Sequence, residues 1–181
     1  ALTPLFVWMA MDFTVPATYA GYAASAYMGA AALSGILAAR WMHRATLKPL
    51  LLLALILLAV LTALGAVSSE FGLFILLRFG AGLLGGFLMS AALTLLLNGM
   101  NAEQRTDAIA IVVSAFALVS IIGMPATLFI AVELGWRIAL MVLAGLCLFA
   151  AVIAYRYLPS SPPLAARASQ LAMGKGAWRW L

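Results

Sequence analysis

Long apolar segments, separated by short polar ones, organise this chain. The clearest example, residues 49–67, contains no charged side chain. About 20 helical residues cross the roughly 30 Å hydrocarbon core of a bilayer, because an α-helix rises about 1.5 Å per residue. The pattern therefore predicts an all-α, polytopic membrane helix bundle, whose complete spans are residues 19–39, 49–67, 71–97, 108–131 and 138–157.

The two ends of the chain differ from these spans. Residues 1–11 are apolar but too short to cross a bilayer before the first charge, Asp12, so we expect them to be the end of a first helix. Residues 12–18 then connect this partial helix to the second span. Residues 1–157 are predicted to form one six-helix transmembrane half-domain, followed by a basic tail, residues 158–181, without an acidic residue.

Composition and charge agree with a lipid environment. Hydrophobic residues make up 67% of the chain and charged residues only 8%, against about 25% charged residues in a soluble domain. The net charge of +5 does not indicate nucleic-acid binding, because the basic residues lie in short segments between spans. Eight of the ten fall on one side of the predicted membrane: Arg40, Arg44, Lys48, Arg105, Arg156, Arg167, Lys175 and Arg179.

This asymmetry predicts an orientation. Basic residues accumulate in cytoplasmic loops, so loops 41–48 and 98–107 and the tail are predicted to be cytoplasmic. Arg137 falls on the opposite side, together with Asp12, Glu70 and Glu133. Arg78 lies inside the fourth span. The chain is therefore expected to be an integral membrane protein, and we expect the membrane to be a bacterial inner membrane.

Arg78 is the strongest candidate for chemistry, because an arginine at the centre of a span costs roughly 2.5–3.5 kcal/mol on insertion scales. One interpretation is a buried cation that lines a polar cavity and binds solute or responds to protonation; the other is a side chain that reaches the outer interface. We favour the first. For Asp12 we favour a loop acid over a proton carrier, since few apolar residues precede it.

Glycine and proline mark expected packing and bending positions. Gly82 and Gly86 form a G-xxx-G pair, which favours close helix packing in lipid. Gly123 and Pro125 interrupt the fifth span, either as a bend that closes one side of a cavity or as a tolerated kink. Residues 103–107 precede this span; we favour a solvated charged loop here, and the alternative is that Thr106 or Asp107 caps the start of the span. With five acids and one histidine, the chain has no residue set for an enzyme, a metal or a cofactor.

The order of these features resembles the N-terminal half of a major facilitator superfamily transporter. The loop after the second span is similar to the family signature G-x-L-a-D-R-x-G-R-[RK], although Ala39 replaces its acid and Met42 its second glycine. The fourth span is similar to the signature R-x-x-x-G, and the fifth to a glycine–proline element followed by a Gly-Trp-Arg turn. The matching residues are Gly35, Leu37, Arg40, Arg44, Arg78, Gly82, Gly123, Pro125, Gly135, Trp136 and Arg137.

The resemblance implies twelve helices in two six-helix halves around a central cavity, worked by alternating access. The chain would be most of one half, and its tail a linker toward a C-terminal half supplied in cis or by a second chain. The function implied is proton-coupled efflux of a small organic solute, similar to that of sugar-efflux, arabinose-efflux or drug:proton antiporters. Arg78 and Asp12 are the candidate substrate- or proton-coupling residues. The other motif residues are expected to serve gating and packing. The alternative is a non-transporting membrane scaffold derived from a half-transporter.

Overall fold

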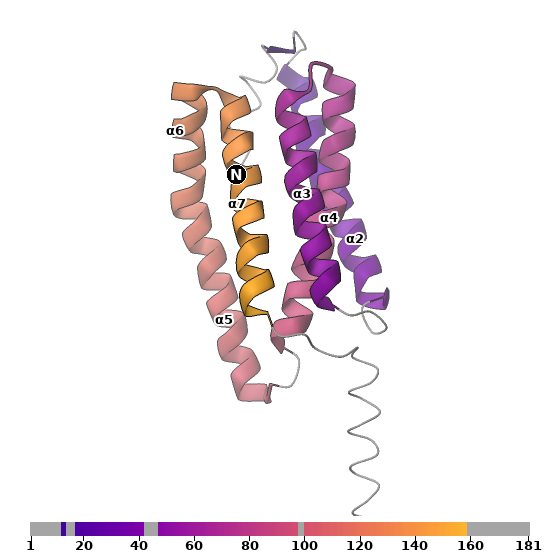
Figure 1. Ribbon diagram of the computed structural model, residues 1–181, viewed down its shortest axis with the longest axis vertical. Helices are drawn as coiled ribbons and strands as arrows, with labels where there is room; N and C mark the ends of the chain where they lie inside the picture. Colours follow the sequence, from indigo (N-terminus) through magenta and orange to yellow (C-terminus); the bar gives the residue numbers. More distant parts are fainter. Residues whose placement is uncertain (1–11, 14–16, 42–46, 98–99, 159–181) are drawn as a thin grey trace, which may run out of the picture.

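The computed structural model describes residues 12–13, 17–41, 47–97 and 100–158 (Figure 1). These residues are helical and contain no strand. The elements in chain order are α2 (Ala17–Trp41), α3 (Leu47–Val67), α4 (Phe71–Leu97), α5 (Ala102–Leu118), the π-helical turn η3 (Val119–Gly123), α6 (Met124–Leu134) and α7 (Trp136–Tyr157). The predicted first segment 1–11, Arg44 and most of the predicted tail lie outside the described residues.

The long helices run up and down side by side (Figure 1). We call the end where α3 and α6 finish the upper end, and the end where α3 and α5 begin the lower end. Helix α3 packs against both α4 and α7, α2 packs against α4, and α6 packs against α7. The continuous run α5–η3–α6 stands at the margin of the bundle, and it has few contacts with helices other than α7.

Four of the described helical segments are long and apolar enough to cross a membrane: Leu47–Val67, Phe71–Leu97, Glu103–Leu134 and Trp136–Tyr157. Helix α2 has 25 residues, which is sufficient length, but it is not among the four. Its many alanine and glycine residues make it less apolar than the others. The prediction of an all-α membrane helix bundle is confirmed.

The start of α5 differs from the expectation. Residues 98–107 were expected to form a loop, with Thr106 or Asp107 as the alternative cap of the next span, but α5 already begins at Ala102 and its N-cap is Asn101. The backbone N–H of Asn101 donates a hydrogen bond to Oε1 of Gln104 over 3.1 Å. This Asn-x-x-Gln arrangement satisfies a free backbone donor at the helix start. Thr106 and Asp107 therefore lie in the second turn of the helix and do not cap it.

The fifth span was expected to be interrupted at Gly123 and Pro125, but the helix is continuous there. The helix continues from Ala102 to Leu134, and the turn before the proline, Val119–Gly123, is π-helical. Proline has no N–H and cannot complete the usual hydrogen bond to the residue four positions earlier. A π-helical turn inserts an extra residue into the helix and accommodates such a defect without a break.

Small side chains dominate the contacts between helices. The buried cluster at the upper end contains Ala23, Ala66, Phe74, Ala131, Trp136, Ala139 and Leu140. A second cluster contains Ala38, Leu47, Leu51 and Ala91. Alanine and glycine let helix backbones approach closely, and van der Waals packing of this kind is a main source of helix association in lipid.

Two contacts at the lower end join α3 to the end of α7. Nζ of Lys48 donates a hydrogen bond to the carbonyl oxygen of Leu158, the residue that follows α7. The same Nζ lies 5.8 Å from the ring centroid of Tyr155. A cation is favourable at this position, because the C-terminus of a helix carries partial negative charge.

Candidate functional site

Among the described residues, one charged side chain is buried inside the bundle, and α4 positions it near the upper end. Arg78 follows the first residue of α4, Phe71, by seven positions, which corresponds to about 10 Å of helical rise. Only 7% of the Arg78 residue surface is exposed. The side chain is therefore buried among the helices.

An aromatic ring lies close to the Arg78 guanidinium group. Its Cζ atom lies 5.1 Å from the ring centroid of Phe74, one turn earlier on the same face of α4. Tyr27 of α2 lies farther along this face, where its hydroxyl occupies the space beside Gly85. A guanidinium over an aromatic ring gains a cation–π attraction, which is stronger where water is excluded.

One nitrogen of Arg78 is not satisfied. The Nη2 atom is buried and has no hydrogen-bond partner among the described residues. Leaving a buried donor unpaired costs about 1–3 kcal/mol, and more when the group is charged. An acceptor oxygen that reached Nη2 would remove this cost. The arrangement is therefore suited to holding an acceptor oxygen.

No carboxylate accompanies Arg78 in the membrane interior. The five acids of the chain lie at the ends of the spans: Asp12, Glu70, Glu103, Asp107 and Glu133. In the described part of the chain, no three His, Cys, Asp or Glu side chains group as metal ligands would. The described interior therefore carries positive charge without a compensating acid.

Asp12 lies at the upper end, in a group that we call the upper clamp: Asp12, Trp136, Arg137 and the carbonyl of Ala66. One oxygen of Asp12, Oδ2, accepts hydrogen bonds from Nε1 of Trp136 over 3.0 Å and from Nε of Arg137 over 3.4 Å. Nη1 of Arg137 also donates to the carbonyl oxygen of Ala66 over 3.3 Å. The structure thus brings Asp12 to the start of α7 and the end of α3, and not to Arg78.

Aromatic rings support the upper clamp from below. Phe13, which follows Asp12, has its ring centroid 5.7 Å from that of Phe74 and 5.5 Å from that of Trp136. The rings of Phe74 and Trp136 are 5.9 Å apart in an edge-to-face arrangement. Phe74 therefore contacts both the upper clamp and the Arg78 guanidinium, so the two features share one side chain.

The glycines of the predicted motifs lie where helices approach one another. Added methyl groups on Gly82 and Gly86 would overlap the backbone oxygens of Tyr27 and Ala31 in α2. A methyl group on Gly35 would lie 3.6 Å from Oγ of Ser90 in α4. Gly123 ends the π-helical turn, and Pro125 lies in the first turn of α6. Arg40 lies near the end of α2, and its side chain is outside the described part.

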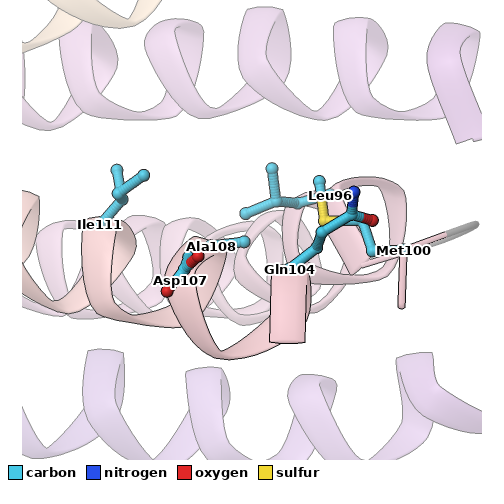
Figure 2. A pocket seen from close by; sticks show the side chains of 6 residues that line it. All are labelled: Leu96, Met100, Gln104, Asp107, Ala108 and Ile111. Carbon is cyan, nitrogen blue, oxygen red and sulfur yellow. The ribbon is translucent and has the colours of Figure 1, made fainter. Parts of the chain in front are cut away.

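A separate open pocket of about 280 Å³ lies at the lower end. The end of α4, the connection after it and the start of α5 supply its lining residues, Leu96, Met100, Gln104, Asp107, Ala108 and Ile111 (Figure 2). Leu96 and Arg78 are 18 positions apart on one helix, which corresponds to roughly 27 Å. The pocket is therefore distinct from the Arg78 site, and its lining is mostly apolar.

Sequence reasoning missed two aromatic residues on this face of α4: Phe74, which lies against Arg78, and Tyr27 of α2, which lies at Gly85. Phe74 could have been found, because residues four apart on a helix share a face. Tyr27 could not, because its position depends on how α2 is placed against α4. The pairing of Asp12 with Arg137 was also missed, although both were assigned to the outer side.

Comparison with known proteins is consistent with this arrangement. The family model described as Major Facilitator Superfamily matches residues 1–179 of the chain. None of the curated proteins compared with the chain matches it. The family match covers Arg78, the upper clamp and all the described helices. The chain therefore belongs to the Major Facilitator Superfamily, a family of secondary membrane transporters.

Proposed function

We propose that the chain forms part of a secondary active transporter that exports a small organic solute by alternating access, in exchange for protons. The observation that carries this proposal is the buried Arg78, 7% exposed, whose Nη2 atom has no described partner. Polar and ionisable residues inside membrane segments are costly, and they commonly mark solute or ion pathways. Asp12 and the motif residues at helix crossings have supporting roles in this scheme.

The exposed face of the bundle supports a second half. The run α5–η3–α6 carries large exposed apolar side chains along its length, such as Ile111, Phe116, Ile121 and Phe129. A six-helix half, in the same chain or in another one, would complete a central cavity with the half that contains Arg78. The upper clamp would hold this half together as it rocks against the other.

Charge supports the orientation. Lys48, Arg105 and Arg156 all lie at the lower end of the bundle. Under the positive-inside rule this end faces the cytoplasm of a bacterial cell. The Arg78 site then lies in the outer half of the bilayer.

Proton coupling needs an acid in addition to Arg78, since an arginine side chain stays protonated in proteins. In the proposed scheme an acid from the second half pairs with Arg78 when it is ionised and releases Arg78 when it is protonated. Asp12 fits this role poorly, because its carboxylate is engaged in the upper clamp at the surface.

The test is export of radiolabelled solutes from cells that produce the protein with its complete reading frame. Arg78→Ala is expected to reduce export by at least about tenfold, because a hydrogen bond to a charged group contributes about 1.5–3 kcal/mol. The matched control is Arg156→Ala, which removes an exposed arginine from the last turn of α7. Unchanged export with Arg78→Ala, at equal membrane abundance, would remove Arg78 from the mechanism.

One sequence feature favours the alternative, a non-transporting scaffold. Ala39 stands where the related loop signature carries an acid, so the charge interactions of that loop are incomplete. A scaffold would produce no solute gradient with any labelled compound, and it would copurify with a larger membrane assembly. Export that depends on a proton gradient would exclude it.

A further inference from the structure

We propose that Arg78 binds a negatively charged group of the transported solute, so that the solutes are organic anions carrying a carboxylate or a phosphate. This inference rests on the proposed function and narrows it to a class of substrate. It follows from the charge balance of the spans, the geometry of the guanidinium group and the position of Tyr27.

The predicted spans of this chain supply no counter-ion for Arg78, so it is free to pair with a solute whenever the proposed acid of the second half is protonated. Between the ends of the predicted spans, Arg78 is the one Lys, Arg, Asp or Glu residue, apart from Arg156 in the last turn of α7. A buried charge is unfavourable unless an opposite charge pairs with it. An anionic group on the solute would supply that charge at the moment of binding. A cationic solute would instead be repelled.

The guanidinium group is presented in a suitable geometry. The Cζ atom of Arg78 lies 5.1 Å from the ring centroid of Phe74, one turn away. Nη2 is the buried nitrogen that has no acceptor among the described residues. Carboxylate and phosphate oxygens match the planar fork of arginine and form two parallel hydrogen bonds with it.

A phenol hydroxyl lies on the same face of α4. Gly85 is seven positions after Arg78, and an added methyl group there would lie 2.6 Å from Oη of Tyr27. The lack of a side chain at Gly85 therefore makes room for a hydroxyl donor about two helical turns from Arg78 along the same face. A second donor on this face suits a solute that carries a further oxygen in addition to its anionic group.

The experiment compares probes that share one ring and differ in charge. The purified protein is placed in nanodiscs of phosphatidylcholine, which has no net charge, and its melting temperature is measured with benzoate, phenyl phosphate, benzamide and benzylamine. A ligand that binds the folded state raises the melting temperature. We expect benzoate or phenyl phosphate to raise it by several degrees more than benzamide or benzylamine. The larger of the two anionic shifts identifies the preferred group.

Variants attribute the shift to Arg78. Arg78→Gln is expected to abolish the difference between benzoate and benzamide, whereas Arg156→Gln is expected to preserve it. If Arg78→Gln does not fold, Arg78→Lys keeps the charge but loses the fork, and benzoate should bind at least about fivefold more weakly. The inference would be overturned if benzoate and benzamide shifted the melting temperature equally, or if benzylamine shifted it more. It would also be overturned if the benzoate shift persisted in Arg78→Gln or was undiminished in Arg78→Lys.

The two proposals can fail separately. If benzoate binds at Arg78 but no solute is exported, the proposed transport function is refuted and the anion site is retained. Export of neutral solutes, together with absence of benzoate binding and of competition by benzoate, would refute the anion site and leave the transport function intact. Loss of the benzoate shift in nanodiscs that contain phosphatidylglycerol would identify a lipid headgroup as a competitor for the same site.

Discussion

One carboxylate oxygen of Asp12 joins two consecutive residues, Trp136 and Arg137. The ion pair with Arg137 is solvent-accessible, with side-chain exposures of 43% for Arg137 and 52% for Asp12. Exposed pairs contribute at most about 1 kcal/mol. The ring of Trp136, 5% exposed, is expected to contribute most of the stability of the upper clamp.

A pair of substitutions separates these contributions. Asp12→Asn should lower the free energy of unfolding by less than about 1 kcal/mol, and Trp136→Ala by about 3–5 kcal/mol, both measured by chemical denaturation in detergent. Export should survive Asp12→Asn. If it is lost while stability is unchanged, Asp12 carries a proton, and the interpretation as a loop acid is wrong.

At the residue scale, sequence reasoning can single out a position that is costly by itself. Arg78 stands out in any apolar segment, because the insertion cost depends on the residue and its depth alone. Its burial, its contact with Phe74 and its unpaired Nη2 depend on neighbouring helices. The same limit applies to Asp12 and Arg137, whose contact joins residues 125 positions apart.

The contact between α2 and α4 depends on glycine. An added methyl group on Gly86 would overlap the backbone of Ala31, and backbone cannot move aside as a flexible side chain can. Gly86→Ala should therefore lower the free energy of unfolding by about 1–3 kcal/mol, a usual cost of overpacking. Gly145→Ala in α7 is the control, because nothing lies within 4 Å of its added methyl group. Equal stability of the two variants would show that the helices separate freely.

The π-helical turn offers a second prediction at this scale. Pro125→Ala restores a backbone N–H next to η3, so the helix can recover an ordinary hydrogen bond there. We expect amide exchange of residues 119–123 to slow by about tenfold, which corresponds to one hydrogen bond of about 1.4 kcal/mol. Hydrogen exchange read by mass spectrometry provides the measurement. Unchanged exchange would mean that packing, and not proline, causes the turn.

Element prediction was strong for the spans and weak for their ends. A bilayer requires about 20 apolar residues, and this requirement makes segments such as residues 49–67 readable from sequence. Helix α5 extends into a polar region because Asn101 and Gln104 form a local cap, a pattern that is visible in the sequence but was overlooked. The π-helical turn has no comparable pattern, since Gly123 and Pro125 also occur at simple kinks.

Orientation is a property of the whole molecule, and it gives the last prediction. With Cys147 replaced by serine, single cysteines are introduced at two exposed positions, Ser69 at the upper end and Asn101 at the lower end. A membrane-impermeant maleimide should label Ser69→Cys in intact cells and Asn101→Cys only after the membrane is opened. The reverse pattern would invert the proposed topology.

At the scale of the whole molecule, the sequence did not predict which helices pack against one another. The spans were predicted in order, but nothing in their composition indicated that α2 packs against α4 or that α3 packs against both α4 and α7. Every span is apolar on all sides, so hydrophobic pattern does not select a partner. The family match agrees with a helical membrane bundle.

The hydrogen bond from Lys48 to the Leu158 carbonyl has a mechanical consequence. Whatever follows residue 158 leaves the bundle from a point attached to two helices, α3 and α7, and not from a loose helix end. A force applied there is therefore shared between them. If this half tilts, residue 158 should therefore move together with α3 and α7 as one rigid unit.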